Sequence, residues 1–351
     1  MKKQILSYLM IAVFLLLCLL PSVGILVTGP SAMLANETAP RTPRLQSRDG
    51  SLNIGFLSDV TDYMESRFAF RPVFVTARSF LYEKLLRSSA EEQVLLGKNG
   101  QLHYSATVDD FCGVGMSDAE LRTVAEHLAA IQDTVEAKGS LFVFTVAPNR
   151  NSLQPENMPA SFRVDHESAN FSRLLPMLEE YGVHTVDLHA LLNRQNLYYL
   201  TDSHWTAEGA AVAADALLAA VGRESRYAAG PFGEDGLHVG DLYQMLYPLG
   251  KGREAEIVYT PGFRHETSSN PQGGNAITIR TTCSEGTGSL YCRRDSFGIS
   301  LYPYLADAFE TAEFSRSADY TVEAFSDIEA DVVILEIVER NLSSLLAAAA
   351  S

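Results

Sequence analysis

The stretch Leu141-Phe142-Val143-Phe144-Thr145-Val146 decides the fold of this chain. It is a continuous apolar run, as expected for a parallel β-strand that is buried on both faces. The run stops at Ala147-Pro148-Asn149-Arg150. A second run of this kind, Ala330 to Ile337, comes late in the chain. We interpret both runs as buried strands of one sheet.

Helical patterns alternate with these strands. Ser117 and Glu120 form a capping box, and apolar residues follow at helical spacing until Gly139. Further helices are predicted over 171–181 and 207–221, and further strands over 183–188 and 289–293. This alternation predicts an α/β fold with a parallel sheet and helices on both faces. Ligands of such sheets bind at the carboxyl ends of the strands, where the sequence puts Asn149, Asp202, His204, Ser296 and Arg340.

Two other regions have weaker patterns. A hairpin is predicted over 94–104, because Lys98-Asn99-Gly100 supplies turn residues between two short apolar runs. The stretch from about 229 to 288 is rich in glycine and proline. We interpret that stretch as insertions and loops.

The N-terminus predicts a membrane helix. Lys2 and Lys3 precede an uncharged apolar stretch from Ile5 to Thr28, and about 20 apolar residues are enough to cross a bilayer. A cleaved signal peptide would have a shorter apolar region and a small-x-small site, which Ala32 to Ala35 match poorly. We therefore expect an uncleaved anchor over 1–28, a linker over 29–56, a catalytic domain over 57–345 and a tail over 346–351.

Composition excludes several functions. The chain has 351 residues, 46% of them hydrophobic, which is enough for one large domain with a sizeable core. A net charge of −16 argues against binding to nucleic acid or to an anionic membrane surface. No Cys-x-x-Cys or His-Glu-x-x-His spacing occurs, so neither a metal nor another cofactor is expected. Cys283 and Cys292 could form a disulfide outside the cell or remain free thiols.

Two short motifs carry the candidate chemistry: Asp202-Ser203-His204-Trp205 and Asp295-Ser296-Phe297-Gly298. A serine hydroxyl becomes a good nucleophile when a histidine removes its proton, and a carboxylate orients that histidine. Each motif also has a structural alternative. Asp202 could cap the following helix, a role for which Thr206 competes, and Asp-Ser is a common turn dipeptide. The other histidines show no such companions and are interpreted as surface or packing residues: His103, His127, His166, His184, His189, His238 and His265.

The joint pattern resembles the DHHW and AlgJ/AlgX-like proteins, relatives of alginate O-acetyltransferases in the SGNH hydrolase superfamily. The resemblance spans roughly residues 60–345. Its main motif is Asp202-Ser203-His204-Trp205, followed by Thr206 and Gly209. Its other matching stretches are 67–71, 94–100, 147–150 with 155–159, 240–242 with 245–246, 295–298 and 338–342.

The resemblance implies an SGNH-hydrolase-like, flavodoxin-like three-layer α/β/α sandwich, circularly permuted so that the Asp and His precede the Ser. It implies that Ser296 is the nucleophile, His204 the base and Asp202 its orienting acid. Tyr302 would either hydrogen-bond substrate or pack in the core. Asn149 and Arg340 are candidates for contact with the oxyanion or the acyl carbonyl, and Trp205 is expected to pack behind the histidine.

These features predict a single-pass protein of the bacterial cell membrane with an extracytoplasmic catalytic domain. Its expected activity is transfer of an acetyl group to a polysaccharide through an acetyl-serine. The resemblance adds a multi-pass membrane acyltransferase as the partner that supplies the acetyl group. An acetyl esterase with the same triad, and a non-catalytic envelope-assembly or glycan-binding protein of the same fold, are the alternatives.

Overall fold

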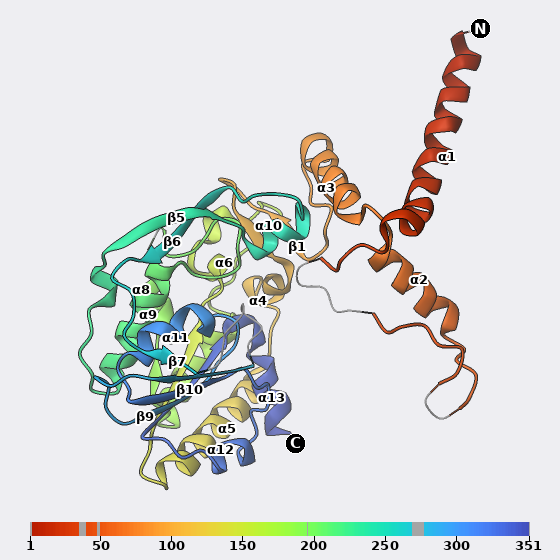
Figure 1. Cartoon of the computed structure of the whole chain (residues 1–351). Coiled ribbons are helices and arrows are strands. Elements are labelled where there is room, and N and C mark those ends of the chain that lie inside the picture. The colour runs from red at the N-terminus through yellow and green to blue at the C-terminus, as the bar shows by residue number, and fades with distance from the viewer. Residues whose placement is uncertain (1, 35–39, 48–49, 195, 269–276, 351) are drawn as a thin grey trace. The chain divides into compact units, whose positions relative to one another are not determined.

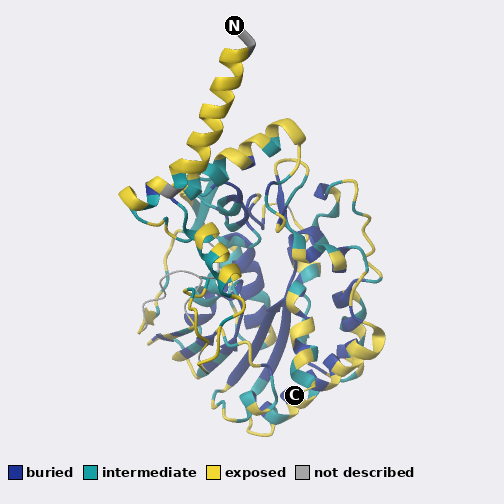
Figure 2. Cartoon of the chain, turned by 90° about the vertical axis from the view of Figure 1, so that its right-hand side faces the viewer, coloured by how far each residue is buried: buried dark blue, intermediate teal, exposed yellow. Residues whose placement is uncertain are grey.

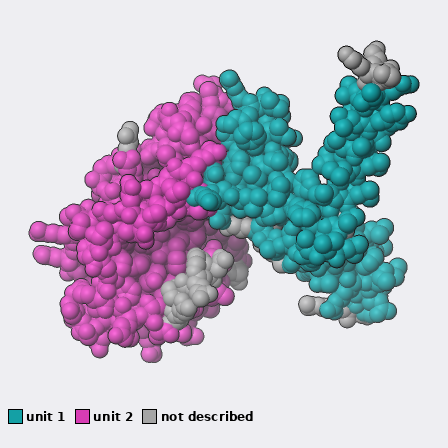
Figure 3. All heavy atoms as spheres, turned by 45° about the horizontal axis from the view of Figure 1, so that its top comes forward, with its two compact units in different colours: residues 1–94, 241–251 teal, residues 95–240, 252–351 magenta. Residues whose placement is uncertain are grey.

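The computed structural model describes residues 2–34, 40–47, 50–194, 196–268 and 277–350. The chain forms two compact units, which Figure 3 shows in different colours. Residues 1–94 and 241–251 make up the first unit, and residues 95–240 and 252–351 make up the second. All the candidate site residues belong to the second unit.

The first unit is helical. Helix α1 (Lys2–Thr28) contains the apolar stretch, and from Gln4 to Thr28 it is long and apolar enough to cross a membrane. It is followed by α2 (Phe56–Arg67), α3 (Arg71–Leu81), a π-helical turn (Tyr82–Leu86) and α10 (Asp241–Leu246). Within this unit the Tyr247 hydroxyl donates a hydrogen bond to Glu83.

The second unit is built on a seven-stranded sheet in the order β4-β3-β11-β9-β10-β8-β7. Strands β4, β3, β11, β9 and β10 are parallel, whereas β8 is antiparallel to both of its neighbours. The sheet is therefore mixed, and the prediction of a parallel sheet is wrong at this edge. The bounds are β3 (Leu141–Ala147), β4 (Thr185–Val186), β7 (Glu266–Thr267), β8 (Thr278–Thr282), β9 (Ser289–Arg293), β10 (Thr311–Ser315) and β11 (Val332–Val338).

Helices cover both faces of this sheet, which confirms the predicted three-layer α/β/α sandwich (Figure 1). Because side chains alternate along a strand, β3 sends Phe142 and Phe144 into one core and Val143 into the other. The inner strands β3 and β11 are buried between the two helical layers (Figure 2). One layer holds α5 (Asp118–Glu136), α7 (Asn170–Glu180), α12 (Glu323–Ser326) and α13 (Ser343–Ala349); the other holds α8 (Leu188–Leu192), α9 (Ala207–Ala220) and α11 (Gly298–Ala306).

Local sequence signals explain the helix ends. The predicted capping box of α5 is present, with the Ser117 hydroxyl accepting from the Glu120 amide and the Glu120 carboxylate accepting from the Ser117 amide. Thr206 caps α9, because its hydroxyl accepts a hydrogen bond from the Gly209 amide. The capping role open to Asp202 in the sequence therefore belongs to Thr206.

The stretch 229–288 was predicted to be loops, and this is wrong for much of it. Strands β5 (Phe232–His238) and β6 (Glu254–Tyr259) form an antiparallel hairpin, and β7 and β8 also lie in this stretch. The predicted hairpin near residue 100 is confirmed as β1 (Val94–Leu96) and β2 (Leu102–Tyr104). The remaining short helices are α4 (Val108–Phe111), α6 (Arg150–Leu153) and the 3₁₀ turns Ser105–Thr107, Pro155–Asn157, Tyr227–Ala229 and Glu339–Asn341.

Cys283 and Cys292 are both buried free thiols. Cys292 lies on β9, and Cys283 directly follows β8, with β10 between these two strands. Neighbouring strands are about 4.8 Å apart, so two intervening spacings exceed the reach of a disulfide. Of the two alternatives open in the sequence, the structure has the free thiols.

Candidate active site

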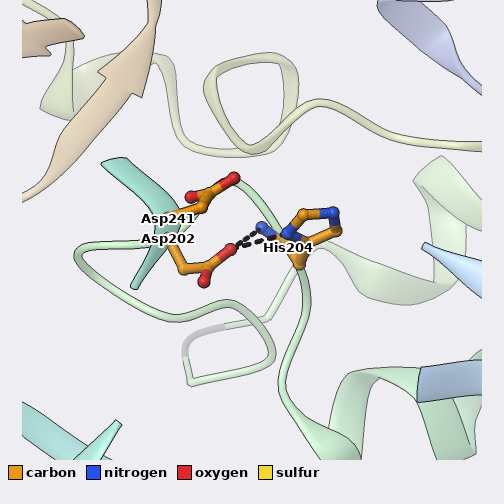
Figure 4. Close-up of side chains that lie close together, drawn as sticks. All are labelled: Asp202, His204 and Asp241. Atoms are coloured by element: carbon orange, nitrogen blue, oxygen red, sulfur yellow. Dashed lines mark hydrogen bonds and ion pairs between the residues drawn. The ribbon is translucent and has the colours of Figure 1, made fainter. Parts of the chain in front are cut away.

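The structure brings Ser296, His204 and Asp202 together in the arrangement of a catalytic triad. Nε2 of His204 lies 2.9 Å from Oγ of Ser296. On the other side of the ring, Nδ1 of His204 lies 2.7 Å from Oδ1 of Asp202. The same carboxylate oxygen accepts from the backbone N–H of His204 at 2.9 Å, and Figure 4 shows both contacts of Asp202 with His204. Asp202 therefore fixes both the orientation and the tautomer of the imidazole.

Asp202 and His204 lie on a short loop that a β-bridge and several hydrogen bonds hold in place. Tyr198 and Trp205 form an antiparallel β-bridge across the base of the loop. The buried guanidinium of Arg150, from the predicted Pro-Asn-Arg motif, donates to the carbonyls of Leu102, Tyr199 and Leu200. On the opposite side, the Glu254 carboxylate accepts from the backbone amides of Leu200 and Thr201 at 2.5 and 2.7 Å. These contacts position the triad carboxylate before any substrate is bound.

Gly240 packs directly against this loop. A Cβ atom at position 240 would lie 2.2 Å from the carbonyl oxygen of Thr201 and 2.9 Å from the backbone nitrogen of Asp202. Gly240→Ala must therefore move the loop. Because a displacement of about 1 Å can cost a catalytic site about 100-fold in rate, we expect kcat/KM for an acetyl ester to fall about 10- to 100-fold.

Thermal unfolding and ester hydrolysis of Gly240→Ala are measured together. The matched control is Gly55→Ala, since the nearest atom to a Cβ there is Oδ1 of Asn53 at 3.3 Å. A Gly240→Ala protein with unchanged kcat/KM would contradict the positioning of Asp202 by this close contact.

Ser296 lies in the turn between β9 and α11. Asp295 holds this turn, because its carboxylate accepts from the amides of Phe297 at 2.8 Å and of Val338 at 2.6 Å. The Asp295 amide in turn donates to the buried carboxyl of Glu336 on the central strand β11. Burial and the neighbouring Asp295 charge raise the pKa of Glu336 well above its usual range. The serine is thus fixed to the middle of the sheet.

Aromatic rings pack behind the triad. The ring of Phe297 lies 4.7 Å from the His204 ring, and the buried Trp205 meets Phe297 edge-on at 5.0 Å. This geometry agrees with the packing role expected for Trp205. The guanidinium of Arg340 lies 5.5 Å from the ring centres of both Phe297 and Tyr104. Arg340 therefore packs against the residue that directly follows Ser296.

Asn149 and Tyr302 have contrasting surroundings. Asn149 follows β3 and is 2% exposed, and neither polar atom of its side chain has a hydrogen-bond partner among the described residues. Its backbone N–H donates to Glu339 at 2.7 Å. Tyr302 packs against Phe314 and His265 at ring distances of 5.5 and 5.9 Å, and it does not line the cavity beside His204. Of the two roles open for Tyr302, these contacts favour packing.

A second histidine adjoins the triad, and the sequence interpretation missed it. Nε2 of His238 lies 2.9 Å from Oδ2 of Asp202, and Nδ1 of His238 lies 2.5 Å from Oε2 of Glu256. Burial lowers the pKa of His238, but its hydrogen bonds to Asp202 and Glu256 outweigh burial and raise it to about 9. The interpretation of His238 as a surface or packing residue is therefore wrong. His265, which contacts Asp307 at 2.8 Å, also corrects that interpretation.

Two cavities adjoin this cluster. One, of about 400 Å³, is lined by Asp202, His204 and His238 and by the rings of Tyr259, Phe263 and Tyr304. The other, of about 710 Å³, shares Tyr199 and Ile257 with the first. Its other lining residues are mainly amides and carboxylates: Asn99, Gln101, Gln154, Asn157, Asn196, Glu156, Glu208, Glu234 and Glu254.

Comparisons with known proteins relate part of this chain to acetyltransferases. Residues 94–254 match the family described as SGNH hydrolase-like domain, acetyltransferase AlgX. Over 143 residues the chain is 32% identical to the "Probable alginate O-acetylase AlgJ" of Pseudomonas syringae pv. tomato. That match covers 38% of this chain and 34% of the relative, so it spans about a third of the length of the curated relative.

Solved structures share the fold. Bacillus cereus PatB1, solved with a sulfonyl adduct, has 15% identity and a TM-score of 0.54, over 71% of this chain and 97% of that one. A DHHW family protein from Eubacterium siraeum has 16% identity and a TM-score of 0.51, over 71% of this chain and 94% of that one. Over residues 94–254 the chain is therefore similar to the SGNH hydrolase-like domain of the acetyltransferase AlgX, which confirms the resemblance inferred from the sequence.

Proposed function

We propose that this chain is a membrane-anchored, extracytoplasmic O-acetyltransferase that acetylates a polysaccharide. The observation that carries the proposal is the contact of Ser296 Oγ with His204 Nε2 at 2.9 Å, with Asp202 on the other ring nitrogen at 2.7 Å. The described relatives AlgJ and AlgX are named for acetylation, which supports acetyl transfer over other acyl chemistry.

In the first half-reaction, Ser296 Oγ attacks the carbonyl carbon of an acetyl donor while His204 Nε2 accepts the serine proton. The resulting imidazolium is stabilised by Asp202, which is 2.7 Å away. Collapse of the tetrahedral intermediate breaks the bond to the donor oxygen, and His204 returns its proton to that leaving oxygen. The product is an acetyl ester of Ser296.

In the second half-reaction, a sugar hydroxyl attacks the ester as His204 removes its proton. Collapse of this intermediate releases the acetylated sugar, and His204 reprotonates Ser296. An acetyl esterase would follow the same steps with water as the acceptor. We assign the unpaired amide of Asn149 and the guanidinium of Arg340 to the acyl oxygen, where one well-placed donor contributes about 3 kcal/mol.

The anchor and the partner belong to the same proposal. The apolar helix α1 would hold the domain at the outer face of a bacterial cell membrane as a single span. If the acetyl group is activated inside the cell, for example as a thioester, a donor must reach the site through the membrane. A multi-pass membrane acyltransferase is the partner that this requirement and the family resemblance favour.

We also propose that the acceptor carries no negative charge. The larger of the two cavities is lined by four carboxylates, Glu156, Glu208, Glu234 and Glu254, and no lysine or arginine is among its described lining residues. A polymer of uronic acids would be repelled there, whereas the amides and carboxylates can hydrogen-bond sugar hydroxyls.

Competition between acceptors tests both transfer and charge preference. The purified chain is given an activated acetyl ester with either neutral oligosaccharides or oligouronates of equal length. We expect acetylated neutral sugar to exceed acetylated oligouronate about 10-fold, a preference that decreases at high salt as charges are screened. Free acetate as the sole product would favour the esterase, and a preference for oligouronates would contradict the acceptor assignment.

A further inference from the structure

The ring of His238 lies between two carboxylates, and this fixes its charge. Its Nε2 faces Oδ2 of Asp202 at 2.9 Å and its Nδ1 faces Oε2 of Glu256 at 2.5 Å. An ionised carboxylate only accepts hydrogen bonds, so each ring nitrogen must carry a proton to satisfy both contacts. A neutral imidazole has one N–H and would leave a nitrogen lone pair facing an anion. His238 is therefore an imidazolium when both carboxylates are ionised.

The surroundings of His238 hold it in this position. Its ring stacks on that of Tyr199, with 3.6 Å between centroids and 6° between planes. The hydroxyl of Tyr199 donates to the other oxygen of Glu256 at 2.7 Å, and the Ile257 amide donates to that hydroxyl at 3.3 Å. The His238 side chain is 14% exposed. Strands β5 and β6 thus place the cationic His238 beside the Asp202 carboxylate, which orients His204.

Resting on the proposed function, we propose that His238 and Glu256 are positioning residues of the acetyl-transfer reaction. They extend the triad into a series of five side chains in contact, in the order Ser296, His204, Asp202, His238 and Glu256. His238 saturates the second oxygen of Asp202, so that the first oxygen stays directed at His204. Glu256 keeps the His238 ring protonated and holds it in its orientation toward Asp202.

The charge of His238 also affects the base. A cation beside Asp202 offsets part of the negative charge that favours protonated His204. His204 is then more readily kept in the neutral form that accepts the serine proton. The groups that face His238 or pair with its backbone are Asp202, Glu256, Tyr199 and, across the hairpin, Glu254; His204 and Tyr259 line the same cavity.

The raised pKa of His238 makes the reaction rate depend on pH. The folded-state pKa of His238, about 9, lies above its ordinary value of 6.5, so its ion pairs stabilise the site below pH 6.5 and are lost as the pH rises through 9. The wild-type rate should therefore rise as His204 loses its proton and fall again near pH 9.

The test measures kcat/KM for p-nitrophenyl acetate from pH 5 to 10 with the full chain in detergent. For His238→Gln we expect a loss of about 10- to 100-fold at pH 8, as is typical of outer hydrogen-bond partners, and no falling limb near pH 9. We also expect its rising limb to move to higher pH. Glu256→Gln should keep the falling limb but move it to lower pH, and Tyr199→Phe should move it less.

His184→Gln is the matched control, since His184 pairs with Glu136 at 3.1 Å but has no contact with the triad residues among its described contacts. Its pH profile should match that of wild type. Unaltered profiles in both His238→Gln and Glu256→Gln would overturn the proposal. If His238→Gln does not fold, the shift in Glu256→Gln decides the matter.

Histidine-selective ¹⁵N NMR separates this proposal from the proposed function. We expect one imidazolium that persists to about pH 9 and that is missing from the spectrum of His238→Gln. If His238 instead titrates near 6.5, the extended triad is wrong even if Ser296 acylates. If His238 titrates near 9 but Ser296→Ala is as active as wild type, the proposed function is wrong and the charge assignment stands.

Discussion

Ser296→Ala should abolish acetyl transfer. The substitution removes the oxygen that lies 2.9 Å from His204 Nε2, and no acetyl-enzyme can then form. Loss of the nucleophile from such triads costs about 10⁴- to 10⁶-fold in kcat. Release of p-nitrophenol from its acetate and formation of acetylated oligosaccharide should fall together, because both products require the same ester intermediate.

The control is Ser343→Ala, at an exposed serine that begins α13. Both variants should keep the thermal unfolding temperature of wild type within a few degrees, because Ser296 is only partly buried and alanine fills nearly the same volume. Residual transfer by Ser296→Ala above about 1% of the wild-type rate would argue that another group accepts the acetyl group.

Asp202→Asn should have the second largest effect, a fall of about 10⁴-fold in kcat near neutral pH. An amide at this position can donate to Nδ1 of His204, which selects the tautomer that leaves Nε2 with a proton. Nε2 then cannot accept the proton of Ser296. The same amide would face the charged His238, which adds to the loss.

Asp307→Asn is the matched comparison for Asp202→Asn. Asp307 makes a buried pair with His265, with Nδ1 and Oδ1 2.8 Å apart, but the described contacts of this pair do not include Ser296. We expect Asp307→Asn to lower the unfolding temperature and to leave kcat within about twofold. A similar loss of kcat in both variants would mean that Asp202 acts through stability rather than through His204.

Much of the fold could be predicted because its signals are local. The apolar run of β3 and the capping box at Ser117 depend on neighbouring residues, and both appear where predicted. Strand β5 has no such signal. Strand β5 reads Phe-Gly-Glu-Asp-Gly-Leu-His, is mostly exposed, and contains a register shift between Glu234 and Leu237. Neither alternation nor composition distinguishes such a strand from a loop.

The candidate site likewise has residues that local sequence signals predict and residues that only the folded hairpin brings together. Asp202 and His204 are two residues apart, so their pairing can be predicted locally, whereas the role of Ser296 as nucleophile comes from the second motif together with the resemblance. His238 and Glu256 meet Asp202 only because the hairpin forms, and 36 residues separate Asp202 from His238. Acidic and apolar residues alternate from Glu254 to Ile257, and this alternation is the local signal for β6. The reversed direction of β8 likewise depends on tertiary pairing and not on its own residues.

Rapid acid quench during turnover of an activated acetyl ester, followed by peptide mass spectrometry, tests the central claim most directly. We expect one acetyl group on Ser296 in the wild-type chain, its disappearance when a neutral oligosaccharide is added, and its absence in His204→Ala. Acetylation of Ser296 that is equally fast without His204, or turnover with no acetyl group at Ser296, would contradict the account.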